Sequence, residues 1–95
     1  MKNIGIAGFG TVGQGFYNQI KKLHKNIKVI QVAVKNLKKK RKINLKEIKL
    51  TSKVQDLAVN PDIDVLVECI GGSGGPAYKL VKAALNNKKH IITAN

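Results

Sequence analysis

The 95 residues contain little of what several protein classes require. Cys69 is the sole cysteine, which excludes a disulfide framework and a paired-cysteine metal site. The two histidines, His24 and His90, are isolated and form no metal-ligand cluster. Tryptophan is absent, and two Phe with two Tyr are too few for the basic-aromatic surface of a single-strand binder. These absences leave a small domain without a disulfide or a metal.

Long apolar segments are missing as well. No apolar run approaches the roughly 18 residues that span a bilayer. The N-terminus, with Lys2 before a very short apolar stretch, lacks the longer apolar region of a signal peptide. We therefore expect a cytoplasmic protein.

Acidic residues are scarce: 5 Asp and Glu stand against 18 Lys and Arg, giving a formal net charge of +13. Nine of the basic residues lie between Lys35 and Lys53. Two interpretations stay open. The segment is a patch that attracts polyanions without choosing among them, or the lysines reflect AT-rich codon usage at surface positions.

Short apolar runs alternate with helical periodicity along the chain. Val12, Phe16, Ile20 and Leu23 recur at steps of three and four, as do the apolar residues from Ala77 to Leu85. Ser52 and Gln55 have the spacing of a capping box, Pro76 suits a first helical position, and Asn60 to Asp62 form a turn. The predicted strands are 2–7, 27–34, 48–51, 65–70 and 90–93, and the predicted helices are 11–24, 53–59 and one from Pro76 to Asn86-Asn87.

A glycine-rich turn joins the first strand to the first helix. Gly8-Phe9-Gly10-Thr11-Val12-Gly13 matches GxGxxG in the strand-turn-helix context that gives this motif its meaning. Gly8 permits a tight turn, Gly10 lets the backbone approach a pyrophosphate, and Gly13 lets the helix pack close to the strand. The N–H groups from Thr11 onward then face the phosphates. The order of elements predicts an α/β fold: a Rossmann-like parallel sheet with helices on both faces, in a single incomplete domain of residues 1–95.

The end of the second strand predicts the nucleotide preference. An Asp or Glu there binds a ribose 2′-OH, but this chain has Val34-Lys35-Asn36 and no acid nearby. Lys35, helped by Lys38, Lys39 or Arg41, meets a 2′-phosphate instead. We expect NADP rather than NAD, with general lysine enrichment as the alternative explanation.

A second glycine-rich segment, Cys69 to Gly75, follows the fourth strand. Backbone at Ile70, Gly71 and Gly72 passes close to the nicotinamide-side ribose, unless this segment is only a flexible connection. Glu68 is interpreted as a structural or hydrogen-bonded carboxylate and not as a general base, and Cys69 as a buried structural thiol. Thr93 and Asn95, after the last strand, reach the same cleft.

Three stretches, "IGIAGFGTVGQG", "DIDVLVECIGGSGGPAYKLVKAAL" and "KKHIITAN", together resemble the N-terminal cofactor domain of homoserine dehydrogenase. The resemblance implies an NAD(P)-dependent oxidoreductase that interconverts homoserine and aspartate semialdehyde, in the biosynthesis of threonine and methionine. It implies cofactor contacts by Phe9, Gly10, Thr11, Val12 and Gly13. It also implies that Lys35 lies near the adenosine ribose, and that Ile70, Gly71, Gly72 and Thr93 flank the nicotinamide half.

The family pattern continues beyond this chain, with an active-site lysine after Thr-Ala-Asn and then a substrate and dimerisation domain. We therefore expect a fragment that binds cofactor, is inactive by itself and has no catalytic residue of its own. Three possibilities stay open: an enzyme half with a separately encoded catalytic partner, a degenerate gene remnant, and a polyanion-binding module built on the Lys35 to Lys53 segment.

Overall fold

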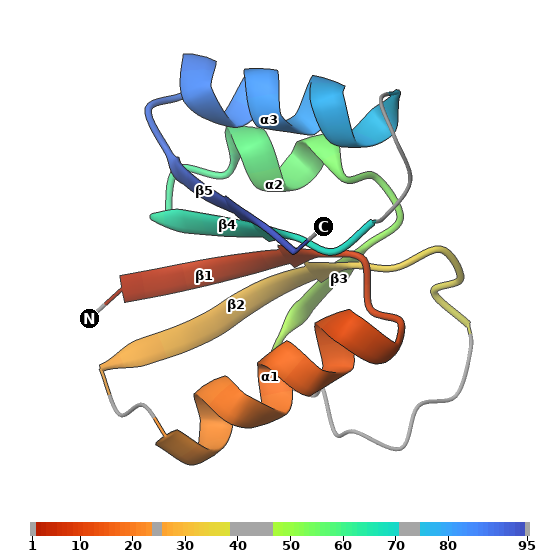
Figure 1. The fold of residues 1–95 in the computed structure, drawn as a ribbon, viewed down its shortest axis with the longest axis vertical. Helices are drawn as coiled ribbons and strands as arrows, with labels where there is room; N and C mark the ends of the chain where they lie inside the picture. The colour runs from red at the N-terminus through yellow and green to blue at the C-terminus, as the bar shows by residue number, and fades with distance from the viewer. Residues whose placement is uncertain (1, 24–25, 39–46, 71–74, 95) are drawn as a thin grey trace.

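The computed structural model describes residues 2–23, 26–38, 47–70 and 75–94 (Figure 1). The strands are β1 (Lys2–Ala7), β2 (Ile27–Ala33), β3 (Lys49–Thr51), β4 (Val65–Glu68) and β5 (His90–Thr93). The helices are α1 (Thr11–Leu23), α2 (Gln55–Val59) and α3 (Pro76–Asn86). Each predicted strand and helix is present in this part of the chain, with ends that differ by one or two residues.

All five strands run parallel in one sheet of order β3-β2-β1-β4-β5. The chain builds outward from β1 to β3 and then crosses to β4 on the other side of β1. Helix α1 covers one face of the sheet, and α2 and α3 lie on the other face (Figure 1). The predicted Rossmann-like α/β fold is confirmed. The strand order reverses between β1 and β4, which is where ligands bind in sheets of this kind.

Each face of the sheet has its own apolar core. Under α1 the buried residues are Ile4, Ile6, Phe9, Tyr17, Ile20, Val29, Val32, Val34 and Val67. Under α2 and α3 they are Ala7, Ala33, Leu57, Ala58, Ile63, Leu66, Leu80 and Ala84. Because the central strands β1, β2 and β4 are largely buried from both sides, they read as nearly continuous apolar runs.

Two predicted apolar faces are only partly correct. Val12, in the first turn of α1, is 57% exposed, and Tyr17 is buried instead. Leu85 is 60% exposed, while Ala83 packs against the core. The side chain of Leu23 lies outside the described residues. Helical periodicity therefore located both helices but misassigned one residue near an end of each.

The predicted capping box at Ser52 and Gln55 is wrong. Helix α2 begins at Gln55 without a side-chain cap hydrogen bond. Thr51, at the end of β3, takes the corresponding role: its Oγ1 accepts from the Lys53 amide at 3.1 Å and donates to the Asp56 carboxylate. The hydroxyl that stabilises the turn between β3 and α2 thus belongs to Thr51, one residue before the predicted Ser52.

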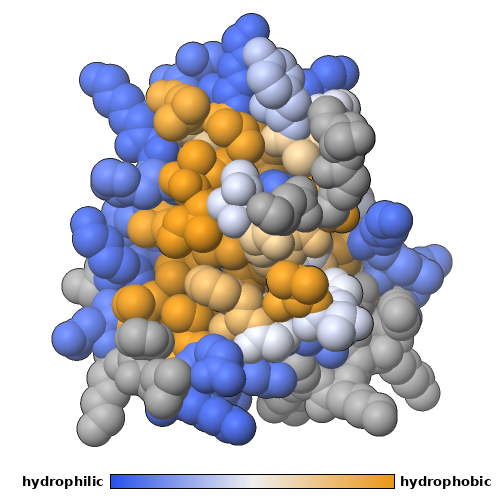
Figure 2. All heavy atoms as spheres, in the orientation of Figure 1, coloured by the Kyte–Doolittle hydropathy of each residue, from blue (hydrophilic) through white to orange (hydrophobic). Residues whose placement is uncertain are grey.

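Strand β5 lies at an edge of the sheet and is poorly covered. Three of its four residues are exposed, and Ile92 has 52% of its surface exposed. Figure 2 shows apolar atoms gathered between α3 and α1, over the region of β5 and its neighbouring strand. Among the described helices, none has the length and apolar character needed to cross a membrane.

Lys89 joins the start of β5 to the turn after α2. Its side chain is 8% exposed, and its Nζ donates to the carbonyl oxygens of Ile63, at 2.9 Å, and Asn60. Lys88, one residue earlier, is exposed. A buried ammonium with two carbonyl acceptors stabilises the connection between two segments that are distant in sequence.

Lys89→Met is expected to lower the free energy of unfolding by about 1–3 kcal/mol, because two buried carbonyl groups lose their charged donor. Lys88→Met is the matched control and is expected to change it by less than about 0.5 kcal/mol. Urea denaturation followed by circular dichroism measures both. Equal stability of the two variants would show that the Lys89 hydrogen bonds contribute nothing.

Candidate functional site

The turn between β1 and α1 is held tightly against the neighbouring strands. Gly8 has a φ of +97°, and its amide donates to the Ala33 carbonyl at 3.0 Å. A Cβ at Gly8 would lie 2.8 Å from the Cys69 carbonyl oxygen, and a Cβ at Gly13 would lie 2.2 Å from the Gly8 oxygen. Both positions therefore require glycine, one for the turn and one for the approach of the helix.

Gly10 differs from the other two glycines. A Cβ there would meet no atom within 4 Å, so the backbone faces open space. Thr11 and Val12, in the first turn of α1, are exposed beside it. The first amides of an α-helix have no intrahelical acceptor and carry the positive end of the helix dipole. This arrangement suits a phosphate group, which needs hydrogen-bond donors and unoccupied space beside the backbone.

Phe9 lies within the turn but points inward. Its side chain is 8% exposed and meets Tyr17 edge to face, with ring centroids 5.9 Å apart. Its carbonyl accepts from the Gln14 side chain at 3.0 Å. The predicted contact of Phe9 with a cofactor is thus limited to backbone atoms, while the ring anchors the turn to the core.

The end of β4 lies directly beside this turn. The Cys69 amide donates to the Ala7 carbonyl at 2.8 Å, and the Ile70 amide donates to Glu68 Oε2 at 2.7 Å. Glu68 is a hydrogen-bonded carboxylate, as predicted. Burial, with the Glu68 carboxylate as a second cause, raises the pKa of the half-buried Cys69 thiol. A raised pKa disfavours the reactive thiolate and agrees with a structural thiol.

The other predicted site residues lie at the same edge of the sheet. Lys35 is exposed two residues after β2, whose Ala33 carbonyl binds the Gly8 amide. Thr93 is exposed at the end of β5, in register with Glu68. Gly71, Gly72 and Asn95 lie outside the described residues. The structure therefore gathers Gly8 to Gly13, Lys35, Ile70 and Thr93 around the carboxyl ends of the strands.

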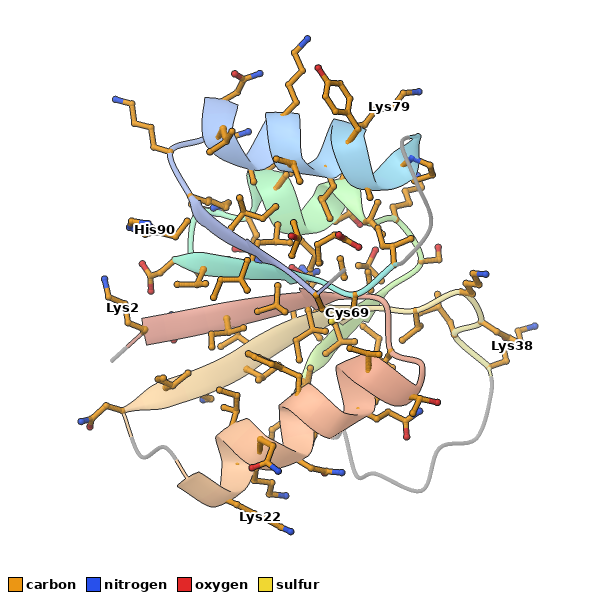
Figure 3. The ribbon with its side chains drawn as sticks, in the orientation of Figure 1. Lys2, Lys22, Lys38, Cys69, Lys79 and His90 are labelled. Carbon is orange, nitrogen blue, oxygen red and sulfur yellow. The ribbon has the colours of Figure 1, made fainter. Side chains whose placement is uncertain are left out.

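Apart from the buried Lys89, the described lysines whose side chains Figure 3 labels point outward on several sides of the molecule. Figure 3 shows Lys2, Lys22, Lys38 and Lys79 on different parts of the surface. Five of the nine basic residues predicted to form a patch fall in residues 39–46, outside the described residues. The polyanion-binding interpretation therefore stays a prediction.

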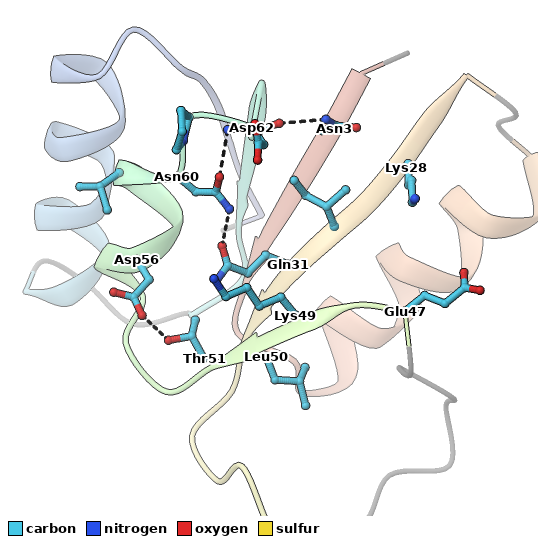
Figure 4. A pocket seen from close by; sticks show the side chains of 13 residues that line it. Asn3, Lys28, Gln31, Glu47, Lys49, Leu50, Thr51, Asp56, Asn60 and Asp62 are labelled. Atoms are coloured by element: carbon cyan, nitrogen blue, oxygen red, sulfur yellow. Dashed lines mark hydrogen bonds between the residues drawn. The ribbon is translucent and has the colours of Figure 1, made fainter.

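A separate polar groove is lined by residues of β2, β3 and the segment around α2, including Lys28, Lys49 and Asp62 (Figure 4). Gln31, which is 2% exposed, accepts in it from the Asn60 side chain at 2.8 Å. Asn3 and Lys28 lie near the amino ends of their strands, whereas the glycine turn follows a carboxyl end. The groove is therefore distinct from the place where the strand order reverses, between the carboxyl ends of β1 and β4.

Comparison with known proteins identifies the family of the chain. The family model described as the NAD-binding domain of homoserine dehydrogenase matches residues 8–95. The chain belongs to the homoserine dehydrogenase family. It is 40% identical to homoserine dehydrogenase of Bacillus subtilis, over 97% of this chain and 23% of that protein. It is also 40% identical to that of Synechocystis, over 97% of this chain and 22% of that protein.

Solved homoserine dehydrogenases share the fold. The Staphylococcus aureus structure at pH 7.0 has a TM-score of 0.88 and 35% identity, over 99% of this chain and 26% of that one. The structure from Thiobacillus denitrificans has a TM-score of 0.85 and 35% identity, over 99% of this chain and 23% of that one. The chain thus spans about a quarter of the length of these relatives. The resemblance predicted from the sequence is confirmed for the NAD-binding domain.

Gly13→Ala is expected to lower the free energy of unfolding by about 1–3 kcal/mol, because the new methyl group would overlap the Gly8 carbonyl and push α1 off the strand. Gly15→Ala in the same helix is the control, since a Cβ there meets nothing within 4 Å. It is expected to stabilise the chain by up to about 1 kcal/mol, because alanine favours helix. Urea denaturation of both variants measures the difference, and equal effects would contradict the close packing at Gly13.

Proposed function

We propose that the chain binds NADP(H) in preference to NAD(H), in the crevice between the ends of β1 and β4. It would serve as the cofactor-binding part of an oxidoreductase that interconverts homoserine and aspartate semialdehyde in threonine and methionine biosynthesis. The observation that carries the proposal is the geometry of the turn from Gly8 to Gly13 in a chain of this family. Two of its glycines are packed too closely for a side chain, and the third opens onto free space beside a helix N-terminus.

The binding roles follow from the positions of the residues. Gly10 and the amides of Thr11, Val12 and Gly13 would hold the pyrophosphate. Lys35, at the end of β2, would face the adenosine ribose, and Ile70 and Thr93 would lie toward the nicotinamide half. The cofactor, when bound, supplies the hydride chemistry, and these residues bind and orient it.

The positive charge of the residues that follow β2 supports the binding of NADP in preference to NAD. Residues 34–38, Val34 to Lys38, contain two exposed lysines and no carboxylate. An ammonium group there favours a 2′-phosphate, whereas the ribose 2′-OH of NAD is usually held by an acid. Lys35 follows Ala33 by two residues, and the Ala33 carbonyl accepts from the Gly8 amide in the glycine turn.

Lys35→Glu is expected to raise the Kd for NADPH about tenfold and to leave the Kd for NADH unchanged or lower, since a charged hydrogen bond is lost. Lys22→Glu makes the same charge change at the far end of α1 (Figure 3) and is expected to keep the wild-type ratio of the two Kd values. Isothermal titration calorimetry at fixed salt measures both. A ratio that Lys35→Glu leaves at its wild-type value would contradict the assignment of Lys35.

Catalysis needs more than an NAD-binding domain. Hydride transfer needs both reactants held in register, and this chain corresponds to the NAD-binding domain and about a quarter of its relatives' length. We propose that a separately encoded catalytic part completes the site. The poorly covered strand β5, with Ile92 exposed, is a surface against which such a part would pack.

The purified chain is expected to produce no NADPH from homoserine and NADP⁺ above the enzyme-free rate. Adding the separately produced remainder of the Bacillus subtilis relative is expected to give measurable turnover, recorded as NADPH absorbance. Homoserine-dependent turnover by the chain alone would contradict the proposed need for a partner. Intact Bacillus subtilis enzyme provides the positive control.

A further inference from the structure

Glu68 is a charged residue buried at the end of β4. Its side chain is 1% exposed, and its Oε2 accepts from the amide of Ile70, two residues further along, at 2.7 Å. Its own carbonyl oxygen accepts from the Ala94 amide at 2.9 Å, after the end of β5. The residue therefore fixes both the backbone that leaves β4 and the end of the neighbouring strand.

The backbone that Glu68 holds forms one wall of the crevice. A Cβ on Gly8 would lie 2.8 Å from the Cys69 oxygen and 3.2 Å from the Ile70 nitrogen. The Cys69 amide is bonded to the Ala7 carbonyl at 2.8 Å. The ends of β1 and β4 thus pack together through Gly8 and the Cys69–Ile70 backbone. The Glu68 carboxylate holds the Ile70 amide at this contact.

Stability alone does not account for a carboxylate at this position. Taking a charge out of water is costly, and replacing buried charges by apolar side chains of similar volume is often neutral or stabilising. The same face of the sheet is otherwise filled by apolar residues such as Leu66 and Leu80. A charge retained in such surroundings, with its Oε2 bound to the Ile70 amide, is explained by what it positions.

We propose that Glu68 is a positioning residue for the dinucleotide, which aligns the Ile70 backbone on the β4 side of the crevice for the nicotinamide half. The inference rests on the proposed NADP(H) binding. The adenosine half would lie toward β2 and the glycine turn, so Glu68 affects only the part of the ligand that crosses to β4. A ligand that lacks the nicotinamide half therefore distinguishes this positioning role from a general effect on binding.

Two variants of nearly equal side-chain size separate the hydrogen bond from the volume. Glu68→Gln keeps an oxygen acceptor for the Ile70 amide, whereas Glu68→Met removes it. Calorimetric titration with NADPH is expected to give a Kd within about threefold of wild type for Gln, and one about tenfold higher for Met. Titration with 2′,5′-ADP, which lacks the nicotinamide half, is expected to give wild-type values for both variants.

Other outcomes would overturn the inference. A Met variant that binds NADPH as tightly as wild type would show that the carboxylate positions nothing. Equal losses for NADPH and 2′,5′-ADP would indicate general damage to the domain, and a Gln variant as weak as Met would exclude the acceptor role. Wild-type chain that fails to bind NADPH at all would instead contradict the proposed function.

A measurement on the wild-type chain covers the case in which Glu68→Met does not fold, as judged by circular dichroism. In ¹⁵N NMR titrations, NADPH is expected to shift the amide resonances of both Gly10 and Ile70. The fragment 2′,5′-ADP is expected to shift that of Gly10 alone. An Ile70 resonance that NADPH leaves unmoved, while Gly10 shifts, would overturn the positioning role.

Discussion

The close approach of Gly8 to the end of β4 is the constraint on which the rest of the site depends. With a Cβ position 2.8 Å from the Cys69 oxygen, this contact requires glycine and brings the ends of two strands together where the sheet reverses its order. Gly13 then lets α1 begin directly above the turn. These two contacts place the N-terminus of α1 beside the end of the β4 backbone.

Much of this fold could be predicted from the sequence, because burial on both faces gives each central strand a nearly continuous apolar run. What the pattern did not predict lies at element ends. Val12 has helical spacing but is exposed, and the turn before α2 uses the Thr51 hydroxyl instead of that of Ser52. Such details depend on where a strand stops, and hydrophobic periodicity does not determine that residue.

The candidate site also has a part that the sequence predicted and a part that only the structure revealed. The glycine turn was found from its motif, since strand, turn and helix are adjacent in the sequence. Its link to β4 joins residues about 60 positions apart, such as Ala7 and Cys69, and only the folded chain brings them together. Glu68 was interpreted from sequence as hydrogen-bonded, but its partner, the Ile70 amide, became clear only from the structure. The roles of Lys35 and Thr93 toward a cofactor stay predictions, although both lie at the expected edge of the sheet.

The most direct test of the account is a crystal structure of the chain grown with NADPH. The account predicts the pyrophosphate against the first turn of α1 beside Gly10, the 2′-phosphate near Lys35, and the nicotinamide half toward Ile70. NADPH bound instead in the polar groove near Gln31 and Asn60, or an ordered glycine turn without NADPH at saturating concentration, would contradict the assignment of this crevice as the cofactor site.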